Sequence, residues 1–376
     1  MRPAGGRGGY PTLWKIRKQL ACGKRRSRSL RLVAALLICV SLIGCEGSDQ
    51  DSAPAFELLE GATMGTYYRV SCRCPSAAAS APENVTESSL AAQITRELEL
   101  VNEQMSTYLP DSELSRFNDG PVAEWQTVSP ALLEVVVAAQ QISRLSDGAF
   151  DITVGPLVNL WGFGPGGRIE AVPDPAELAA ARSRVGSGYL EQDPMRPALR
   201  KTRPVYLDLS AIAKGHGVDR IAAVLDLQGC SDYLVDIGGE VIARGLNPRG
   251  QSWRIGIEVP DPDRMGGVQR ILRLPDVAVA TSGDYRNFLD LDGQRISHTV
   301  DPRSGRPVTH GLASVSVVHS SAMWADGLAT ALNVLGPEAG YQLALQQDWA
   351  AFFLTRRAAG FEERYTPAMQ QYLETP

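Results

Sequence analysis

Three residues in the C-terminal part of the chain are of the types that hold a metal ion and move a proton. Asp326 and Thr330 are four positions apart, so on a helix both side-chain oxygens lie on one face. A carboxylate plus a hydroxyl is the hard oxygen donor set that suits Mg²⁺. His298, one of four histidines, lies in a polar, turn-rich stretch. The spacing indicates a magnesium site with a nearby base. The alternatives are purely structural roles: an Asp–Thr hydrogen bond and a histidine that only stabilises the fold.

Four further stretches carry polar residues at turns. Asp151 lies between Gly and Pro turns in residues 148–157 (GAFDITVGPL), which suits a ligand contact or a simple cap. A strand is expected to end at Asp208 and a helix to begin after Ser210, where backbone groups suit an anion, a metal or an ordinary cap. Residues 236–240 (DIGGE) fit a turn whose paired glycines let another group come close to the backbone, or an ordinary hairpin. Residues 280–287 (ATSGDYRN) fit a phosphate site or a hairpin.

The charges divide the chain into a basic head and an acidic body. Residues 1–44 hold ten Lys and Arg and no Asp or Glu, whereas the rest holds 27 Lys and Arg against 42 Asp and Glu. The apolar run at 32–40 is shorter than the ~20 residues that span a bilayer and fits the core of a secretory signal. A basic head on an acidic body excludes a basic nucleic-acid binder.

The end of this leader predicts a lipid anchor. Residues 42–45 (LIGC) resemble the bacterial lipobox, whose cysteine is acylated before cleavage. We therefore expect a lipoprotein signal peptide at 1–44, a tether at 45–55 and one domain at 56–376. A plain cleaved signal with an incidental Cys45 is the alternative.

The elements that would position the polar residues are helices mixed with runs of strands. Apolar residues at helical spacing predict helices at 88–101, 129–146, 175–185, 214–227, 321–335 and 340–346, with Asp174 as the cap of the third. Segments rich in β-branched and aromatic residues predict strands at 67–72, 205–209, 233–237, 240–244, 253–259, 270–274, 278–281, 287–291 and 313–318. This order favours an α+β fold over a regular βαβ alternation.

The cysteine spacing predicts no disulfide in the acidic body. Cys72 and Cys74 are one residue apart, an unfavourable geometry for a bond to each other, and they lack the second pair that a zinc site needs. We expect Cys230 to be a small buried apolar residue.

One glycine-rich stretch imitates a dinucleotide-binding fingerprint. Residues 162–167 (GFGPGG) match G-x-G-x-x-G, but Pro165 lies inside and no helical pattern follows. The fingerprint requires a strand before it and a helix after it. The chain also lacks a nucleophile elbow, a P-loop, a zinc-type histidine pair and a kinase signature.

Taken together, these motifs resemble the ApbE family of FAD:protein FMN transferases, which are periplasmic lipoproteins of bacteria. The likeness extends from Met64 to Gly336, and residues 105–118 (MSTYLPDSELSRFN) are similar to the family's M-S-T-Y-x-P-x-S-x-L-x-x-F-N stretch. The resemblance implies an α+β fold with a duplicated T-fold-like core, mixed and antiparallel sheets and packed helices. It also implies FAD as the substrate and one Mg²⁺ site.

Matched motif by motif, the resemblance implies roles for particular residues. Contacts to FAD are expected from Met64, Tyr108, Ala149, Phe150, Asp151, Asp208, Lys214 and Val300. Metal ligands are expected from Asp326, Thr330 and the backbone carbonyl of Ala211. Some relatives have Glu at the position of Lys214, and a hydroxyl residue sometimes replaces Ala211, which favours a backbone ligand there.

The implied reaction transfers the FMN part of FAD to a Thr or Ser hydroxyl of a target protein through a phosphoester bond and releases AMP. A metal would neutralise charge on the phosphates, and a base would help the neutral hydroxyl attack. His298 is the first candidate for the base and Asp301 the second. Hydrolysis of FAD to FMN and AMP, and non-catalytic FAD binding, are the competing hypotheses.

Family analogy also suggests partners and a location. We expect a protein anchored by a lipid at Cys45 on the periplasmic side of the inner membrane, with membrane redox-complex subunits as targets and no nucleic acid as partner. An acidic body that binds a dianionic pyrophosphate needs local positive charge. The charge balance therefore makes a cation at Asp326 and Thr330 more necessary.

Overall fold

A computed structural model describes residues 55–75, 89–261, 266–283, 288–291, 294–358 and 360–374. These residues all belong to one compact unit, Ala53–Pro376. The predicted signal peptide, Cys45, most of the tether and residues 284–287 lie outside the described residues, so the predictions made there stay predictions. Within the described ranges, no helix has both the length and the apolar character needed to cross a membrane.

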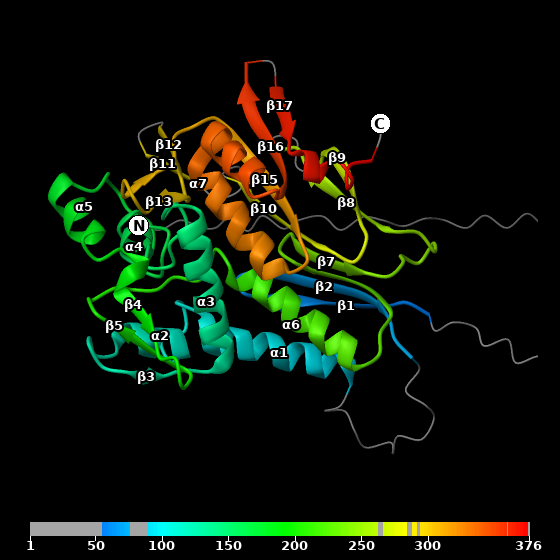
Figure 1. The fold of residues 1–376 in the computed structure, drawn as a ribbon, viewed down its shortest axis with the longest axis horizontal. Coiled ribbons are helices and arrows are strands. Elements are labelled where there is room, and N and C mark those ends of the chain that lie inside the picture. Colours follow the sequence, from blue (N-terminus) through cyan, green and yellow to red (C-terminus); the bar gives the residue numbers. More distant parts are fainter. Residues whose placement is uncertain are drawn as a thin grey trace, which may run out of the picture. The chain divides into compact units, whose positions relative to one another are not determined.

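An eight-stranded antiparallel sheet is the backbone of this unit (Figure 1). Its order is β1-β2-β6-β7-β10-β15-β16-β17, so strands from both ends of the described chain lie in one sheet. The strands are β1 (Glu57–Thr63), β2 (Thr66–Arg73), β6 (Asp232–Ile237), β7 (Glu240–Arg244), β10 (Ala278–Gly283), β15 (Leu312–His319), β16 (Ala350–Arg357) and β17 (Gly360–Tyr365).

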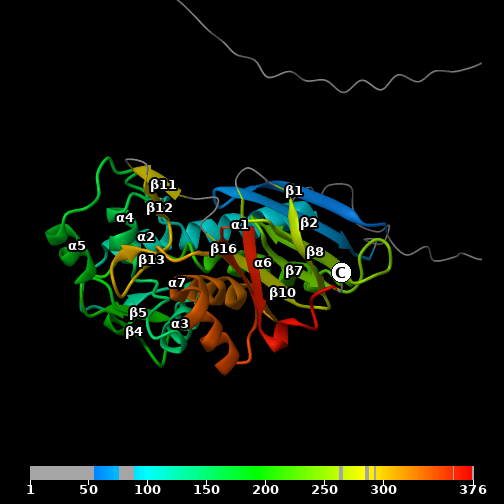
Figure 2. The ribbon, with the colours of Figure 1, turned by 90° about the horizontal axis from the view of Figure 1, so that it is seen from above.

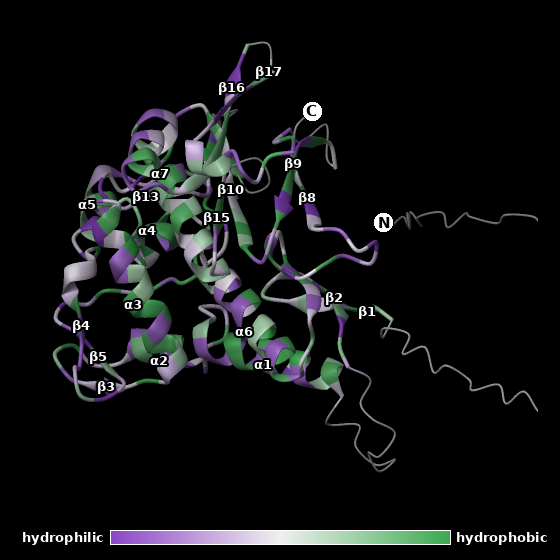
Figure 3. Ribbon diagram, turned by 45° about the vertical axis from the view of Figure 1, so that its right-hand side comes forward, coloured by the Kyte–Doolittle hydropathy of each residue, from purple (hydrophilic) through white to green (hydrophobic). Residues whose placement is uncertain are grey.

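The two faces of the sheet are covered differently. Long helices pack on one face: α1 (Leu90–Met105), α3 (Pro130–Leu145), α6 (Ala213–Leu227) and α7 (Ala322–Gln346). The other face is covered by a hairpin of β8 (Trp253–Glu258) and β9 (Val268–Leu274) and by the 3₁₀ turn η4 (Pro367–Met369). Along β7, Ile242 joins the helix-side core while Val241 and Ala243 join the hairpin-side core, as strand alternation requires. Figures 2 and 3 show the layers and the mixed hydropathy of the helices.

A second group of short elements lies beyond the ends of α3 and α7 (Figure 1). It holds two of the described two-stranded sheets and one three-stranded sheet, of order β3-β5-β4. Its elements are α2 (Glu113–Asp119), β3 (Gln126–Thr127), α4 (Gly155–Leu160), α5 (Pro175–Arg182), η2 (Ser187–Tyr189), β4 (Leu190–Gln192), β5 (Ala198–Lys201), β11 (Phe288–Leu291), β12 (Gln294–Ser297), β13 (Val300–Asp301) and β14 (Arg306–Pro307).

The helix boundaries follow the local chemistry that the sequence contains. Ser89 and Ser129 accept hydrogen bonds from the first turns of α1 and α3, and Asp174 forms a capping box with Glu177 at α5, as N-cap residues do. The two predicted helices at 321–335 and 340–346 are the two arms of α7, which is broken at Gly336 (φ 80°) just before Pro337. The α+β prediction is confirmed.

The predicted strand at 205–209 is wrong. Only Tyr206 forms an isolated bridge, to Val154. The side-chain amide of Asn118 takes the place of a neighbouring strand, because it donates to Leu207 O at 2.9 Å and accepts from Leu207 N at 2.7 Å. The segment is extended here, and both backbone polar groups of Leu207 are hydrogen-bonded, although the segment belongs to no sheet.

The prediction of no disulfide is also wrong, although Cys230 is buried in the apolar core as predicted. Cys74 and Cys230 are bonded, with Cα atoms 3.9 Å apart. The antiparallel register of β2 and β6 pairs Arg73 with Asp232 and so brings Cys74 beside the residues that precede β6. Cys72 is free and buried, and burial raises the pKa of its thiol to about 11.

Candidate functional site

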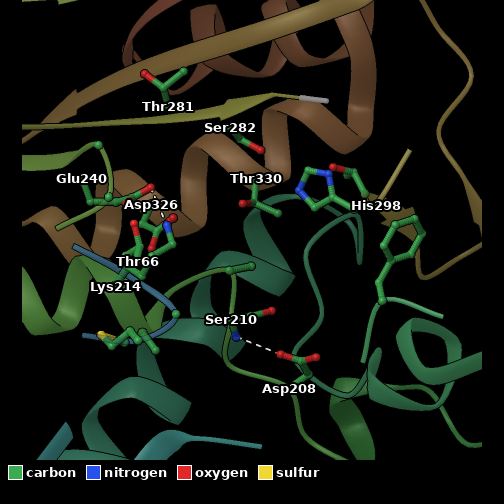
Figure 4. Close-up of a pocket in the computed structure, with 18 of the residues that line it drawn as sticks. Thr66, Asp208, Ser210, Lys214, Glu240, Thr281, Ser282, His298, Asp326 and Thr330 are labelled. Atoms are coloured by element: carbon green, nitrogen blue, oxygen red, sulfur yellow. Dashed lines mark hydrogen bonds and ion pairs between the residues drawn. The ribbon is translucent and has the colours of Figure 1, made fainter. Parts of the chain in front are cut away.

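A cavity of about 1440 Å³ opens between the main sheet, α7 and the loops of the second group (Figure 4). Ordinary small-molecule sites measure roughly 300–1,000 Å³, so this cavity has room for a ligand larger than a mononucleotide. Its walls mix apolar side chains with carboxylates, hydroxyls and one imidazole.

The structure brings every site residue predicted from the sequence to the lining of one cavity. They are Met64, Tyr108, Ala149, Phe150, Asp151, Asp208, Ala211, Lys214, His298, Val300, Asp326 and Thr330. Asp301, the second candidate for the base, does not line the described cavity, and its carboxylate accepts hydrogen bonds from Arg303 at 2.9 and 3.0 Å. The geometry therefore favours His298 over Asp301, while the chemical role of each lining residue stays a prediction.

The tight turn between β1 and β2 carries Met64 into the cavity. Thr63 pairs with Thr66 across the turn, and Met64 and Gly65 have φ values of 48° and 71°. A two-residue hairpin turn with positive φ at both positions matches the twist of its strands. A left-handed backbone is unusual for Met, and strain of this kind collects at ligand sites.

Asp208 stabilises the turn that leads into α6. Its Oδ1 accepts from Ser210 N at 2.8 Å, and its own N–H donates to Ile152 O at 2.7 Å. Ile212, the N-cap of α6, makes no side-chain cap. Ala211 thus lies beside the cavity, in a turn at the head of a helix whose N-cap side chain makes no hydrogen bond to the first turn.

Asp151 is buried, and hydrogen bonds from the protein reach both of its carboxylate oxygens. Oδ1 accepts from Thr153 N at 2.8 Å and from Thr153 Oγ1 at 2.7 Å, and Oδ2 accepts from Ser187 N at 2.7 Å. Burial raises its pKa, and these hydrogen bonds oppose the rise. The carboxylate therefore fixes the loop that presents Ala149 and Phe150 to the cavity.

The most charged part of the wall joins α6, β7 and α7. The Lys214 ammonium lies 2.6 Å from Glu240 Oε1, and Gly215 N donates to Asp326 Oδ2 at 3.1 Å (Figure 4). Burial raises the pKa of Glu240 to about 7 and also raises that of Asp326, while Lys214 opposes both shifts. Burial acts to lower the pKa of Lys214, but Asp326 and Glu240 outweigh it and the pKa is raised.

Close contact between α6 and α7 sets the position of Asp326. A Cβ on Gly215 would lie 2.3 Å from Ala322 O, so only glycine permits this crossing. Asp219 of α6 caps α7 by accepting from Ala322 N at 2.8 Å and Met323 N at 3.0 Å. The start of α7 is thereby attached to the helix that carries Lys214.

His298 lies in the link between β12 and β13 and is half-buried. Its ring meets the ring of Phe163 edge-on, with centroids 6.3 Å apart and 69° between the planes. The next residue, Thr299, accepts from Asn333 of α7 at 3.4 Å. Tyr108, which is 65% exposed, donates to Phe163 O at 3.3 Å. Phe163 therefore connects the predicted base to a predicted flavin contact.

Two parts of the wall were not predicted as site residues. Glu240 was expected only as the end of a glycine turn, and no feature of the sequence pairs it with Lys214. The GFGPGG stretch is not a dinucleotide fingerprint, as predicted, because α4 precedes it and no helix follows. It nevertheless lines the cavity through Gly162, Phe163, Gly164 and Gly167. Its position shortly after the GAFDITVGPL motif, with only residues 158–161 between them, was the available signal.

The predicted metal ligands form an all-oxygen set. A carboxylate, a hydroxyl and a backbone carbonyl fit Mg²⁺, which binds proteins through few carboxylates and keeps other positions for water and substrate phosphates. No cluster of three or more His, Cys, Asp or Glu suitable for a metal occurs in the described ranges. That finding is compatible with this set, which contains one carboxylate.

Comparison with known proteins agrees with the resemblance found in the sequence. The ApbE family profile matches residues 64–353. A protein of Vibrio cholerae serotype O1 named FAD:protein FMN transferase is 43% identical over 343 residues, which cover 91% of this chain and 98% of that protein. The protein of the same name from Escherichia coli K12 is 36% identical over 351 residues, covering 92% and 98%.

Solved structures agree with these relatives. The flavin transferase ApbE from Vibrio cholerae superposes with a TM-score of 0.76 at 43% identity, covering 85% of this chain and 99% of that one. The apo flavinyl transferase ApbE of Pseudomonas stutzeri gives 0.75 at 41% identity, covering 84% and 96%. With a profile match over most of its length and relatives of this identity, the chain belongs to the ApbE family.

Proposed function

We propose that this chain is a Mg²⁺-dependent FAD:protein FMN transferase that links the FMN part of FAD to a Thr or Ser hydroxyl of a target protein and releases AMP. Flavin transfer from FAD to protein is the activity for which its relatives are named. The metal, the acceptor hydroxyl and the residue roles are the finer parts of the proposal. The observation that carries it is the convergence on one cavity of a histidine, an all-oxygen donor set and the apolar contacts expected for FAD.

The dimensions and composition of the cavity suit a dinucleotide. FAD has two ring systems joined by a pyrophosphate, and the cavity offers apolar and aromatic side chains such as Phe150 and Phe163 beside polar groups. The isoalloxazine and adenine rings would pack on the apolar parts. The pyrophosphate would face Asp326 and Thr330.

His298 would take the proton of the acceptor hydroxyl as that oxygen attacks the phosphorus of the FMN half. An O–P bond to the acceptor forms, the P–O bond to the AMP half breaks, and AMP leaves with the bridging oxygen. The proton passes from His298 to AMP or to water. A base within reach of the hydroxyl contributes about 10²–10⁴-fold to such a step. Phe163 limits the orientation of the imidazole by packing on it edge-on.

Asp326, Thr330 and the carbonyl of Ala211 would hold the metal. When bound, Mg²⁺ supplies positive charge that neutralises the pyrophosphate oxygens. Among the described residues, six carboxylates line the cavity, from Asp151, Asp208, Asp236, Glu240, Glu258 and Asp326. The two described cations of the lining are Lys214 and Arg168. A dianionic substrate therefore needs an added cation, which supports the metal on grounds of charge.

The location and targets are part of the proposal. A lipid on Cys45 would hold the enzyme on the periplasmic side of the inner membrane, within reach of membrane redox-complex subunits. The support is the LIGC ending of the leader and the polar stretch that follows it. Labelling with radioactive palmitate, and its loss in Cys45→Ala, tests the anchor.

One assay tests the reaction itself. The purified chain is incubated with FAD, Mg²⁺ and a Thr-containing target protein, and all products are analysed by mass spectrometry. Covalent FMN on the target together with AMP is the expected result. Free FMN and AMP without labelled target would indicate a pyrophosphatase, and unchanged FAD would indicate a binding protein. Asp301→Asn is the matched control, because retained transfer separates His298 from the second candidate base.

A further inference from the structure

We infer that Glu240 is a positioning residue, which holds the Lys214 ammonium away from Asp326 and so keeps that carboxylate available to Mg²⁺. The inference rests on the proposed metal site. Glu240 belongs to none of the contacts expected for FAD or the metal.

The geometry shows one cation between two carboxylates. Lys214 Nζ lies 2.6 Å from Glu240 Oε1, and the Asp326 carboxylate is close enough to interact electrostatically with both groups (Figure 4). The three residues come from α6, β7 and α7, and all of them line the cavity. Two buried carboxylates therefore compete for one ammonium, and the structure pairs it with Glu240.

Burial strengthens the competition of the two carboxylates for Lys214. Glu240 and Asp326 are 4% and 5% exposed, so water does little to screen their charges. Lysine is a point charge on a flexible stem with three donors, and it can move between acceptors. Without Glu240, the remaining carboxylate that interacts with Lys214 among the described residues is Asp326. An ammonium on Asp326 would occupy the oxygens and neutralise the charge that the metal requires.

The free oxygen of Glu240 is consistent with a holding role. Within the described residues, Glu240 Oε2 is buried and has no hydrogen-bond partner, whereas Oε1 is the atom that meets Lys214. A carboxylate kept buried and half-satisfied costs stability. The cost is explained if the negative charge is needed at this place. One ammonium and two carboxylates leave one negative charge, which a divalent cation converts to one positive charge facing the pyrophosphate.

The test measures Mg²⁺ binding directly, by isothermal titration of MgCl₂ into the apo chain and by the Mg²⁺-induced shift in melting temperature. Glu240→Gln should weaken Mg²⁺ binding about tenfold or more, the scale on which loss of an outer partner lowers metal affinity. Transfer at saturating Mg²⁺ should keep a near-normal kcat. Glu258→Gln, which removes another lining carboxylate, is the matched control and should leave Mg²⁺ affinity near the wild-type value.

The double variant Lys214→Met/Glu240→Gln separates positioning from direct ligation. With no ammonium to restrain, loss of Glu240 should no longer matter, and Mg²⁺ affinity should return to the wild-type value or exceed it. Affinity as weak as that of Glu240→Gln alone would mean that Glu240 binds the metal itself and would overturn the inference. If Glu240→Gln does not fold, the double variant is compared with the wild type: equal or tighter Mg²⁺ binding supports the inference, and binding weaker by about tenfold or more overturns it.

The outcomes also distinguish this inference from the proposed function. A wild-type chain that binds Mg²⁺, with Glu240→Gln equal to it, overturns the positioning role and leaves the metal site intact. An equal loss in Glu258→Gln would trace the effect to the total charge of the cavity and would overturn the positioning role as well. A wild-type chain that binds no Mg²⁺ up to millimolar concentration overturns both.

Discussion

Two lysines that lie 13 positions apart in the chain are accommodated in opposite ways. Lys201 on β5 is 2% exposed and donates to the carbonyls of Phe117, Asn118 and Gly120 at 2.9, 2.6 and 2.9 Å. Lys214 on α6 is 29% exposed into the cavity and meets the carboxylate of Glu240, with Asp326 nearby. The first ammonium is satisfied by neutral dipoles, whereas the second is surrounded by more negative charge than it carries.

The difference separates scaffold from binding site. Lys201 caps the C-terminal end of α2, where carbonyls and the helix dipole favour a cation, and burial lowers its pKa. The Lys201 ammonium needs no further hydrogen-bond partner there. Around Lys214 the carboxylates raise the pKa despite burial, and a carboxylate oxygen of Glu240 is left without a described partner. A cluster that is incomplete in the protein alone is one that a ligand completes.

The largest expected effect comes from removing the groups that the ligand requires. Asp326→Ala and His298→Ala should each lower the rate of FMN transfer by at least about a hundredfold, because one removes a predicted metal ligand and the other the predicted base. Transfer is followed by mass spectrometry of the target. Full retained transfer by either variant would remove that residue from its role.

Removing the scaffold lysine should produce the opposite pattern. Lys201→Met keeps the apolar stem but removes the ammonium donor of three carbonyls at the end of α2. Phe117 O keeps its hydrogen bond from Gly120 N, so the carbonyls of Asn118 and Gly120 lose most, and each buried orphan costs about 1–3 kcal/mol. We expect urea denaturation to show a loss of roughly 3–5 kcal/mol, with normal transfer by the folded fraction.

The neighbouring residue gives the control for this variant. Arg200 is on the same strand, and its side chain, paired with Glu191, is 34% exposed. Arg200→Met should cost less than about 1 kcal/mol, as exposed ion pairs do. If Lys201→Met abolished transfer in protein that is fully folded, the division between the two lysines would fail.

Most of the scaffold could be predicted from the sequence, because its signals are local. The caps at Ser129 and Asp174 and the apolar stripes of α1, α3 and α6 are contained in single segments. The strand β16 was missed, because its first five residues, 350–354, are a continuous apolar run buried on both faces, a pattern that strands and buried helices share. The stretch at 205–209 failed because its partner, Asn118, is 89 residues away.

The candidate site was predictable in its membership but not in its interactions. The family resemblance named eleven residues and the expected chemistry added His298, and all twelve line the cavity. The pairing of Lys214 with Glu240 was not predictable, because it depends on how α6 meets the β6–β7 turn. The disulfide depends in the same way on the register of β2 with β6 across 156 residues.

The disulfide allows the same comparison, scaffold against binding site, between the two ends of α6, the helix that carries Lys214. α6 has the cavity at its first turn, and Cys230, just after its last turn, is bonded to Cys74. The double variant Cys74→Ser/Cys230→Ser should lose about 2–4 kcal/mol of stability. Its transfer rate at 25 °C should stay normal, since the bond is remote from the predicted base and metal ligands.

Alkylation gives the control for the cysteine experiment. Cys72 has a buried thiol with a pKa near 11, so iodoacetamide should label it only after unfolding, because the thiolate is the reactive form. Labelling of Cys74 in the native wild type without reductant would show that the bond is absent. A large loss of transfer in the folded double variant would show that both ends of α6 act as one unit.

The smallest effect tests whether an incomplete polar group always marks a site. His216, also on α6, is 2% exposed, its Nε2 has no partner in the described part of the chain, and it does not line the cavity. Burial, with a contribution from Arg220, lowers its pKa to about 4. Here the orphan nitrogen is part of the scaffold and has no ligand to complete it.

The consequence should be visible as a pH dependence of stability. The unfolded chain takes up the His216 proton near pH 6.5, whereas the folded chain takes it up only near pH 4. Between these values the unfolded state binds more protons, so the free energy of unfolding falls as the pH falls, by up to about 3 kcal/mol. Above pH 6.5 both states are neutral and the effect vanishes.

In His216→Leu this contribution is absent, and the difference between the two unfolding curves isolates it from other titrating groups. A difference that stays constant from pH 7 to pH 4 would mean that His216 titrates normally in the folded protein. In that case its orphan nitrogen would be accessible after all, and His216 would not be an incomplete polar group of the scaffold.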